Sequence, residues 1–371
     1  MSVEQLLASL QTLSPLLGRE MALGRREARL PDPVARELLD RGLFRVWIPV
    51  RFGGFELTLS EALQVYEAAA RLDGSVGWAV MIGSGGGLFA AYLSPPVASR
   101  LFAMRGAVVA GSGAPTGIAE RVPGGYRATG HWRYASGAHY ASVFTANCRI
   151  QENGVPVMHD GQPLIRAMCF SPDDVSIQHS WDTHGLRATG SHDIEVTRVL
   201  VPEDSTFSVM TDAPRHDGPL YQLPFGTLTE LPVTAVVLGI AQHVLEEFEA
   251  LAQHKPAPGT SLPLIQYDAV NRALRDAHAR VDAVRGTLYD LADAAWNAAL
   301  VDGSPDACVI EACTLTSKRL VRELIDAIGL LVPLAGMNAI HREDPFAIAW
   351  QDLNAAAAHY SVSPLGDLRK D

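Results

Sequence analysis

The stretch that decides the fold is Tyr126-Arg-Ala-Thr-Gly-His-Trp-Arg-Tyr-Ala-Ser-Gly-Ala-His-Tyr-Ala-Ser-Val-Phe-Thr-Ala-Asn147. It follows a turn signal, Pro123-Gly124-Gly125, and it ends in an apolar run. Glycines punctuate residues that favour an extended backbone, so the stretch predicts a strand, a tight turn and a second strand. This pattern is typical of a hairpin in any β-barrel. It could also hold a flat ring against its aromatic side chains and the hydroxyl of Ser136.

The composition indicates a large, well-packed and acidic chain. Of its 371 residues, 48% are hydrophobic and 19% are charged, so the chain can bury a sizeable core and disorder is not expected. The net charge of −11 argues against nucleic acid or an anionic membrane as a partner. No uninterrupted apolar run approaches about 18 residues, and the first residues carry no basic segment ahead of an apolar one. We therefore expect a cytoplasmic protein.

The cysteines and histidines do not predict a metal site. The four cysteines contain no CxxC pair, and all of them stand in apolar surroundings typical of core positions. Three histidines, His179, His184 and His192, lie close together in the sequence. They lack the i, i+4 spacing and the neighbouring carboxylates of a helical metal site, so we expect solvated loop histidines.

The periodicity of the apolar residues divides the chain into three regions. Residues 1–106 show helical spacing interrupted by short turns. Residues 107–212 change toward strict alternation, which is typical of strands. Residues 213–371 return to helical spacing with short connections, which predicts an antiparallel bundle. The helices expected in this bundle cover residues 232–253, 266–301, 306–331 and 345–359.

Several motifs resemble those of one family along nearly the whole chain. Gly130-x-x-x-Tyr134-x-Ser136 resembles the flavin-side motif of the acyl-CoA dehydrogenase superfamily, Gly-x-x-x-Trp-x-Thr-Asn-Gly. Asp182-Thr-His-Gly-Leu-Arg-Ala-Thr-Gly-Ser191 resembles its strand-entry motif, and the segment from Pro263 to Arg285 is similar to a helix of its bundle. The resemblance implies an α+β fold of acyl-CoA dehydrogenase type. Its parts would be an N-terminal helical domain (1–106), a central β-barrel (107–212) and a C-terminal four-helix bundle (213–371).

Other motifs of the dehydrogenases are missing. The end of the chain has no Tyr-Glu-Gly glutamate to act as a base. The motifs that hold the distal half of FAD are replaced by His254-Lys-Pro-Ala-Pro-Gly259 and by Asp326-Ala-Ile-Gly-Leu-Leu-Val332. The ending Trp350-Gln-Asp-Leu-Asn-Ala-Ala-Ala-Ala-His359 is instead similar to that of the two-component, reduced-flavin-dependent monooxygenases. Gln351 departs from the arginine usual there, so one phosphate or structural contact is not carried over.

The resemblance to this branch implies a flavin-dependent monooxygenase. A separate flavin reductase would supply reduced FMN or FAD, which would capture O2 as a C4a-hydroperoxyflavin. The chain would then use this species to oxygenate a hydrophobic or aromatic small molecule. The superfamily's bundles pair across two-fold axes, which implies a homotetramer, with a dimer as second choice.

The same resemblance assigns roles to individual residues. His359 would act as a general base on the substrate's exchangeable proton, and Ser136 would donate a hydrogen bond to the flavin N5 or peroxide edge. Three glycines, Gly85–Gly87, stand on the helix where aromatic hydroxylases of this branch often carry a histidine, which implies either a wider pocket or a substrate not held by that histidine. The other predicted contacts are Ser112, Trp132 and Tyr134 with the cofactor, and Trp78, Tyr92 and Gly86 with the substrate.

Two alternatives remain open on the sequence alone. One is a flavin dehydrogenase or oxidase that acts on an acyl thioester or a carrier-bound substrate with a relocated base. The other is a flavin-binding scaffold that has lost catalysis. A dehydrogenase needs a carboxylate base over the flavin. One measurement separates the three interpretations: oxygen is admitted to the protein with anaerobically reduced flavin, and a long-lived C4a-adduct band in the near ultraviolet indicates a monooxygenase. Bleaching of oxidised flavin by an acyl thioester indicates a dehydrogenase, and the absence of both signals indicates a scaffold.

Overall fold

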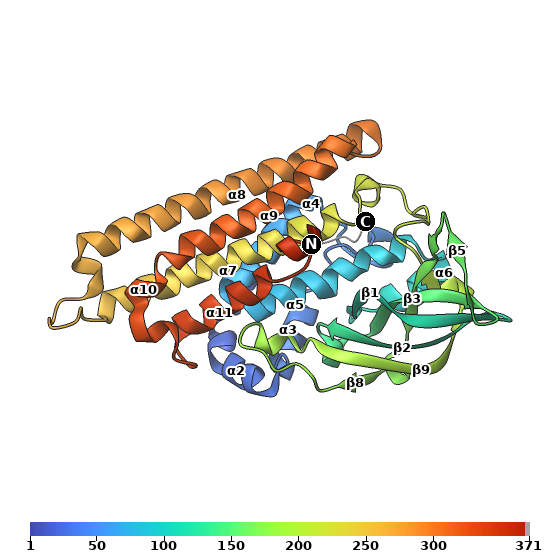
Figure 1. Ribbon diagram of the computed structural model, residues 1–371, viewed down its shortest axis with the longest axis horizontal. Helices are drawn as coiled ribbons and strands as arrows, with labels where there is room; N and C mark the ends of the chain where they lie inside the picture. Colours follow the sequence, from blue (N-terminus) through green and yellow to red (C-terminus); the bar gives the residue numbers. More distant parts are fainter. Residues whose placement is uncertain (368–371) are drawn as a thin grey trace.

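The computed structural model of the chain describes residues 1–367 and contains three parts in chain order (Figure 1). Helices at the N-terminus are followed by a sheet, and a long helical bundle closes the chain. Figure 1 shows the sheet at one end of the molecule and the bundle extending away from it. The predicted order of helical domain, β domain and bundle is confirmed.

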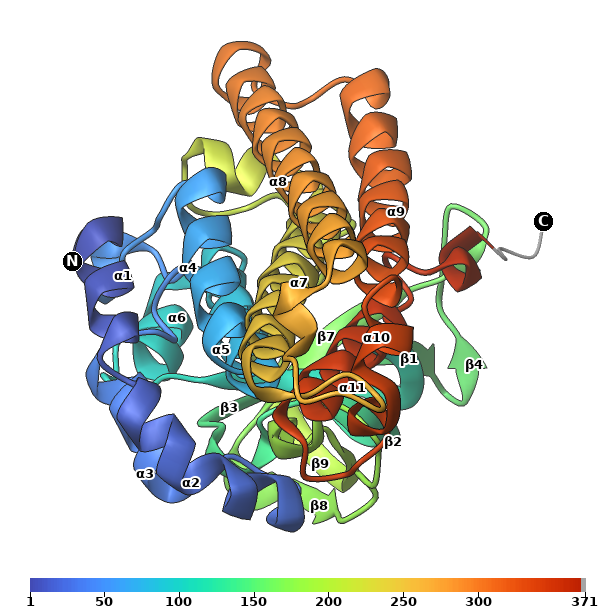
Figure 2. The same cartoon turned by 90° about the vertical axis from the view of Figure 1, so that its left-hand side faces the viewer.

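The N-terminal helices begin and end where short-range signals place them. Thr58 and Glu61 form a reciprocal capping box at the start of α4. The first apolar run breaks near Pro15, which lies in the first turn of the second helix. Figure 2 shows these helices side by side along one edge of the molecule. Their bounds are α1 (Val3–Gln11), α2 (Ser14–Glu27), α3 (Asp32–Asp40), α4 (Leu59–Leu72), α5 (Gly74–Gly85) and α6 (Pro95–Phe102), with 3-10 turns at Val50–Phe52 and Gly86–Ala91.

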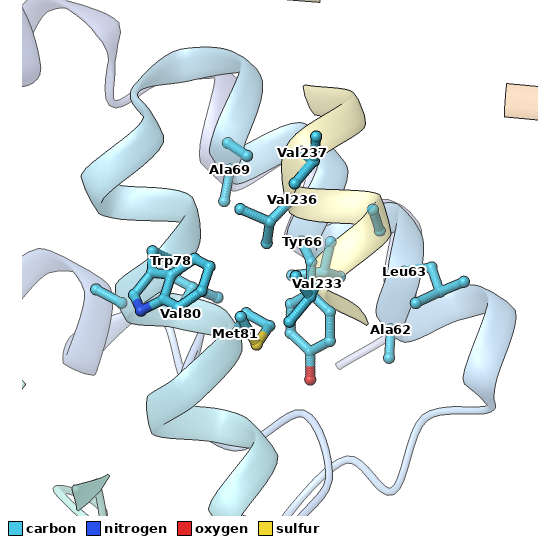
Figure 3. Close-up of a cluster of buried hydrophobic side chains, with 14 of the residues drawn as sticks. Ala62, Leu63, Tyr66, Ala69, Trp78, Val80, Met81, Val233, Val236 and Val237 are labelled. Carbon is cyan, nitrogen blue, oxygen red and sulfur yellow. The ribbon is translucent and has the colours of Figure 1, made fainter. Parts of the chain in front are cut away.

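Three helices from two parts of the chain share the centre of the main core. A Cβ added at Gly77 of α5 would lie 2.3 Å from the Cα of Ala70 on α4, and one at Gly239 of α7 would lie 2.2 Å from the carbonyl oxygen of Glu67. Such contacts require glycine, because any side chain would overlap a backbone. Figure 3 shows the apolar side chains of this region, among them the fully buried Tyr66. The N-terminal helices and the bundle are therefore one packed unit.

The β part is an eight-stranded sheet in the order β10-β7-β3-β1-β2-β9-β8, with β4 paired to β3. In the described residues this order is an open path, so the predicted barrel is a curved sheet whose two end strands are not joined by hydrogen bonds. Its inward side chains form a core separate from the main one. The strands are β1 (Val109–Val122), β2 (Gly125–Ala135), β3 (Val143–Glu152), β4 (Val155–Pro156), β7 (Ile165–Phe170), β8 (Ser176–Gln178), β9 (His192–Pro202) and β10 (Thr206–Phe207); β5 (Met158–His159) and β6 (Gln162–Pro163) pair separately.

The prediction of a hairpin within residues 126–147 is wrong. The two strands of that stretch, β2 and β3, are separated by β1, which pairs antiparallel with β2 and parallel with β3. The tight turn lies earlier, at Pro123-Gly124, where Gly124 has φ +88°. After β2 the chain leaves the sheet at Gly137 and makes a 3-10 turn before β3. This detour carries Ser136 out of the sheet and toward the helices.

The C-terminal bundle is built around α7, which packs on α4 as well as on its bundle partners. Helix α7 begins at Thr227, whereas the sequence had predicted a start at residue 232. Pro232 therefore lies inside the helix. A buried carboxylate, Glu67 of α4, accepts hydrogen bonds from Gln242 of α7 (2.9 Å) and from Arg285 (2.8 Å) and Tyr289 (2.6 Å) of α8. The bundle comprises α7 (Thr227–His254), α8 (Asp268–Asp302), α9 (Ala307–Gly329), the short α10 (Val332–Ala335) and α11 (Pro345–Ala357).

Two helical stretches of the described chain are long and apolar enough to cross a membrane by length and composition alone. They are Gly74–Ala91 and Thr227–His254. In each, an apolar segment of 18 residues is mostly buried inside the fold, to 83% in the first and 78% in the second. Neighbouring helices and the sheet cover them, as expected of core helices. Their apolar character is therefore explained by the packing around α7.

Candidate active site

The structure brings together three residues that the sequence had singled out from distant positions. His359 lies just past the end of α11, and its ring meets the indole of Trp78 edge-on, with 5.5 Å between centroids. The indole Nε1–H of Trp78 donates a hydrogen bond to Ser136 Oγ over 3.1 Å. Each residue comes from a different part of the chain: α5, the segment after β2, and the segment after α11. The candidate active site thus lies where the three parts meet.

An irregular end of β2 positions Ser136. The register between β2 and β9 shifts between Trp132 and Ala135, and Tyr134 takes a left-handed backbone conformation with φ +68°. Such bulges re-aim side chains and are frequent next to active sites. Gly137 follows with φ +79°, and a Cβ there would lie 2.8 Å from the hydroxyl of Tyr140. The backbone N–H of Gly137 donates to Thr189 O over 2.9 Å, which ties the turn to the segment before β9.

Ser136 begins a row of buried hydroxyl groups that the sequence had not assigned to the site. Its Oγ lies 2.7 Å from Ser191 Oγ, and Ser191 Oγ lies 2.7 Å from Thr189 Oγ1. Thr189 in turn donates to the carbonyl oxygen of Leu186 over 2.8 Å. All three hydroxyl residues are buried. The only sequence signal was the Thr-x-Ser ending of the strand-entry motif, whose role the spacing does not reveal.

The rest of that motif fixes the row against the bundle. A Cβ at Gly185 would lie 2.1 Å from the carbonyl oxygen of Gln351, so glycine is required for the loop to approach α11. Leu186 has φ +51°, and its backbone N–H donates to Asp352 Oδ1 over 2.6 Å. Arg187 donates to the backbone oxygen of Arg25 over 3.0 Å. Gly-Leu-Arg therefore docks the β part onto both helical parts.

Asp352 holds this junction from within the bundle. Burial raises the pKa of its carboxyl, and so does the charge of Asp73, while the Leu186 hydrogen bond, Arg25 and His243 act in the opposite direction. Asp73 caps α5 through Ser75 N and Val76 N and forms an ion pair with Arg25 at 3.2 Å. Both oxygens of Asp352 are enclosed, because one accepts from Leu186 and the other faces Gly74. This carboxyl supports the site and does not reach a substrate.

His359 is a neutral imidazole in these surroundings. Burial lowers its pKa to about 4, so the ring is uncharged near neutral pH. Nδ1 lies 2.8 Å from Ser361 Oγ. In the described residues the ring contacts Trp78 and Tyr360 and no carboxylate.

The β part carries further aromatic and hydroxyl groups at the positions predicted to contact a cofactor. Tyr134 is 62% exposed and meets Trp181 edge-on, with 6.1 Å between ring centroids. Ser112 lies half-buried at the point where the register between β1 and β3 shifts, and the four residues after it are exposed. The buried hydroxyl of Tyr140, behind Gly137, has no hydrogen-bond partner among the described residues. Aromatic and hydroxyl groups of this kind suit a flat heteroaromatic ring with a polar edge.

Trp132 is not part of this surface. Its side chain is fully enclosed in the core of the sheet, where Gly117 and Gly130 leave room for the ring. Its Nε1–H donates to the carbonyl oxygen of Asn147 over 2.9 Å, and it packs against Phe170. The predicted contact with the cofactor is therefore corrected to a structural role, because residues alternate between the two faces of β2.

The structure also separates Tyr92 and Gly86 from the His359 group. Tyr92 stacks on Phe207 and lines a charged pocket of about 410 Å³ that includes the ion pair of Arg166 and Asp212. A Cβ at Gly86 would lie 2.4 Å from Val109 Cβ, so this glycine allows contact with β1 and does not widen a pocket. At the preceding residue, Gly85, an added Cβ would meet nothing within 4 Å. Of these two glycines, Gly85 leaves open space beside it and Gly86 does not.

Histidines do gather beside the hydroxyl row, where His192 pairs with Ala135 of β2 and His139 follows Gly137. Those at positions 139, 179 and 192 place one ring nitrogen each within 4.8 Å of one another. We expected solvated loop histidines, but His192 is buried. His184 is exposed, as expected. Nδ1 of His192 accepts from Trp181 N over 3.1 Å, and Nε2 lies 3.2 Å from Ala28 O. A metal ion would have to displace one of these two partners.

Gln351 borders a groove of about 390 Å³ between α11 and the loop that carries the Gly-Leu-Arg motif. Its walls include Trp350 and Asn354 from α11 and His184 from the loop. The lining of the groove contains no arginine or lysine. No cationic side chain there replaces the arginine that related monooxygenases have at the position of Gln351.

Comparisons with known proteins agree with the fold. Models of the N-terminal and C-terminal domains of acyl-CoA dehydrogenase match residues 17–94 and 231–364. The indole-3-acetate monooxygenase of Pseudomonas putida is 28% identical over 335 residues, which are 88% of this chain and 83% of that protein. The flavin-dependent monooxygenase oxygenase subunit HsaA of Mycobacterium tuberculosis is 25% identical over 381 residues, with 97% and 92% coverage.

Solved structures share the fold over the full length. XiaF from Streptomyces, in complex with FADH2 and glycerol, superposes with a TM-score of 0.88 at 24% identity, covering 97% of this chain and 92% of that one. The two domain models, their order along the chain and the three-part architecture lead to one conclusion. The chain belongs to the acyl-CoA dehydrogenase family.

Proposed function

We propose that the protein is the oxygenase component of a two-component flavin-dependent monooxygenase that acts on a hydrophobic or aromatic small molecule. The observation that carries the proposal is the nature of the base at the junction. A neutral, partly buried histidine stands there, whereas a dehydrogenase needs an accessible carboxylate. Asp352, the carboxyl that holds the junction, is enclosed and bonded to Leu186, and its neighbour Asp73 is engaged by Arg25 and the first turn of α5. The names of the relatives, monooxygenases and hydroxylases, support the same class.

The chain's own residues would act by positioning and by proton transfer. The reduced flavin supplies the activation of molecular oxygen when it is bound. Ser136, Tyr134 and Ser112 would hold its ring against the end of β2. Trp78 would form the wall between the flavin and the helices, and uncharged His359 would accept the exchangeable proton of a phenol or amine. Burial of Trp78, Ser136 and His359 at the junction would keep bulk water away from the reacting atoms.

The choice between FAD and FMN belongs to this proposal as well. One relative is an FADH2-dependent resorcinol hydroxylase, and XiaF carries FADH2, which favours FAD. KijD3, a neighbour of the same fold, binds FMN. The absence of a cation from the groove beside Gln351 weakens one anchor for a diphosphate. We propose reduced FAD as the principal cofactor, with FMN accepted more weakly.

We further propose a cytoplasmic homotetramer that receives its flavin from a separate reductase. Oxygenase subunits of this kind, such as HsaA, support the need for a reductase. The bundle exposes large apolar side chains, which suit a contact between copies of the chain. The most exposed are Leu300, Val301, Leu315, Met337 and Ile340. Light scattering at micromolar concentration should give the mass of four chains, and a monomer would contradict this assembly.

The function is tested by following the origin of oxygen in the product. Purified protein, a flavin reductase, NADH and FAD would be incubated under 18O2 with a panel of aromatic compounds that includes indole-3-acetate and resorcinol. Incorporation of one 18O atom into a product, lost in His359→Ala, is the expected result. Bleaching of oxidised flavin by an acyl thioester would show a dehydrogenase instead. Flavin binding with neither reaction over a broad panel would favour the scaffold.

A further inference from the structure

We propose that the buried hydroxyl row fixes Ser136 as a hydrogen-bond acceptor toward the cofactor, and that the site therefore selects reduced over oxidised flavin. Thr189 and Ser191 become positioning residues that set this polarity. The inference rests on the proposed function, because it requires the flavin N5 edge to meet Ser136. It reverses the donor role that the family motif had suggested for this serine.

Counting protons along the row gives its direction. Three short oxygen–oxygen contacts join Ser136 to Ser191, Ser191 to Thr189, and Thr189 to the Leu186 carbonyl, at 2.7, 2.7 and 2.8 Å. Each hydroxyl has one proton, and the carbonyl has none. All three contacts contain a proton only if every hydroxyl donates toward Leu186. Any other arrangement leaves two buried oxygens facing each other without a proton, which is unfavourable.

The other end of the row is fixed by the indole. Trp78 Nε1–H can only donate, so Ser136 must accept from it over 3.1 Å. Ser136 Oγ then has its proton committed to Ser191 and one lone pair committed to Trp78. A single lone pair remains for a ligand. Asp352 supports the far end, because it accepts from the backbone N–H of Leu186 and holds the residue whose carbonyl ends the row.

This polarity distinguishes the two redox states of a flavin. Reduced flavin carries a proton on N5 and can donate to the free lone pair of Ser136. Oxidised flavin has only a lone pair on N5, which would face the lone pair of Ser136. A hydrogen bond gained in one state and an unpaired acceptor left in the other should make reduced flavin bind at least about tenfold more tightly at this contact. A protein that receives reduced flavin and releases oxidised flavin needs such a preference.

The experiment measures binding of both redox states to variants that change the polarity. Dissociation constants of oxidised and dithionite-reduced FAD, and of the FMN pair, would be determined anaerobically for the wild type, Ser191→Ala and Thr189→Val. In Ser191→Ala the proton of Ser136 loses its acceptor and can turn toward the flavin. In Thr189→Val it is Ser191 that loses its acceptor, so Ser191 can donate to Ser136 instead and release the proton of Ser136 toward the flavin. The preference for reduced flavin should fall about tenfold, and oxidised flavin should bind more tightly than to the wild type. A gain in affinity for one redox state is not a consequence of structural damage.

The matched control is Ser84→Ala. Ser84 is a fully buried serine on α5, and its hydroxyl bonds to Tyr66 and lies outside the row. It should leave the ratio of the two dissociation constants unchanged. An unchanged ratio in Ser191→Ala and Thr189→Val, or a wild type that binds both states equally, would overturn the inference while leaving a flavoprotein. Failure of the wild type to bind flavin in either state would instead overturn the proposed function on which it rests.

Discussion

Substitution of Asp352 by asparagine should remove a pH dependence from the stability of the protein. Burial first, and then the neighbouring Asp73, raises the pKa of the Asp352 carboxyl. The folded chain therefore retains a proton that the unfolded chain releases. Over the range from the ordinary aspartate pKa of about 4 up to the raised value, the free energy of unfolding falls as pH rises. The slope from one such group is at most about 1.4 kcal/mol per pH unit.

Asparagine keeps the shape of the side chain and can still accept the 2.6 Å hydrogen bond from Leu186 N. It does not titrate, so the slope due to this group disappears. Urea unfolding of both proteins, measured from pH 5 to pH 8.5, is the assay. The difference in free energy of unfolding should move in favour of Asp352→Asn as pH rises, by up to about 1.4 kcal/mol per unit, and then level. Arg25 and His243 also face this carboxyl, but they are common to both proteins.

Asp326→Asn serves as the control, because Asp326 lies on the surface of α9 in an i, i+4 pair with Arg322. Its difference from the wild type should stay flat over the same pH range. A constant gap for Asp352→Asn, or a gap that moves in favour of the wild type with rising pH, would refute the raised pKa. It would also show that the carboxylate is needed in its charged form to hold Leu186.

Three further predictions concern packing and chemistry. Glu67→Gln should lower the free energy of unfolding by about 2 kcal/mol, because Arg285 loses its carboxylate partner; urea unfolding measures it, and no change would contradict the pairing. Gly77→Ala should cost about 1–3 kcal/mol in the same assay, since its Cβ would lie 2.3 Å from Ala70 Cα, and a stabilised variant would refute the contact. His359→Ala should slow product formation by ~10²–10⁴ without weakening flavin binding, and the wild-type rate should show no acid limb from this group until pH falls toward its pKa of about 4.

Local patterns predicted the helices well and the strand pairing poorly. The turn at Pro123-Gly124 depends on residues a few positions apart, and the structure confirms it. The capping box that starts α4 at Thr58 depends on equally local residues. The partner of β2 depends on residues far along the chain, so a stretch that looks like a hairpin can be split by another strand. Alternation alone also could not tell which face of β2 would be inward, and Trp132 was therefore placed on the wrong side.

The site was predicted in part because family motifs mark single residues and not the bonds between them. The resemblance pointed to Trp78, Ser136 and His359, and the structure brings these three together. It could not show that Ser136 accepts from one of them, because a hydroxyl serves equally as donor and acceptor in a sequence. The burial that lowers the pKa of His359 was also hidden, since it depends on packing between α11 and α5.

The strand-entry motif shows why the missing information is long-range. Gly185 and Leu186 place the segment against α11, and Thr189 and Ser191 follow with their hydroxyls in one row. The Leu186 carbonyl gives the row its direction, and groups from elsewhere hold both ends: Trp78 donates to Ser136, and Asp352 fixes the backbone of Leu186. Neither Trp78 nor Asp352 lies within a hundred residues of the motif along the sequence. A proton order that selects a redox state is thus a property of the assembled junction, and replacing either end should change it even though the motif itself is intact.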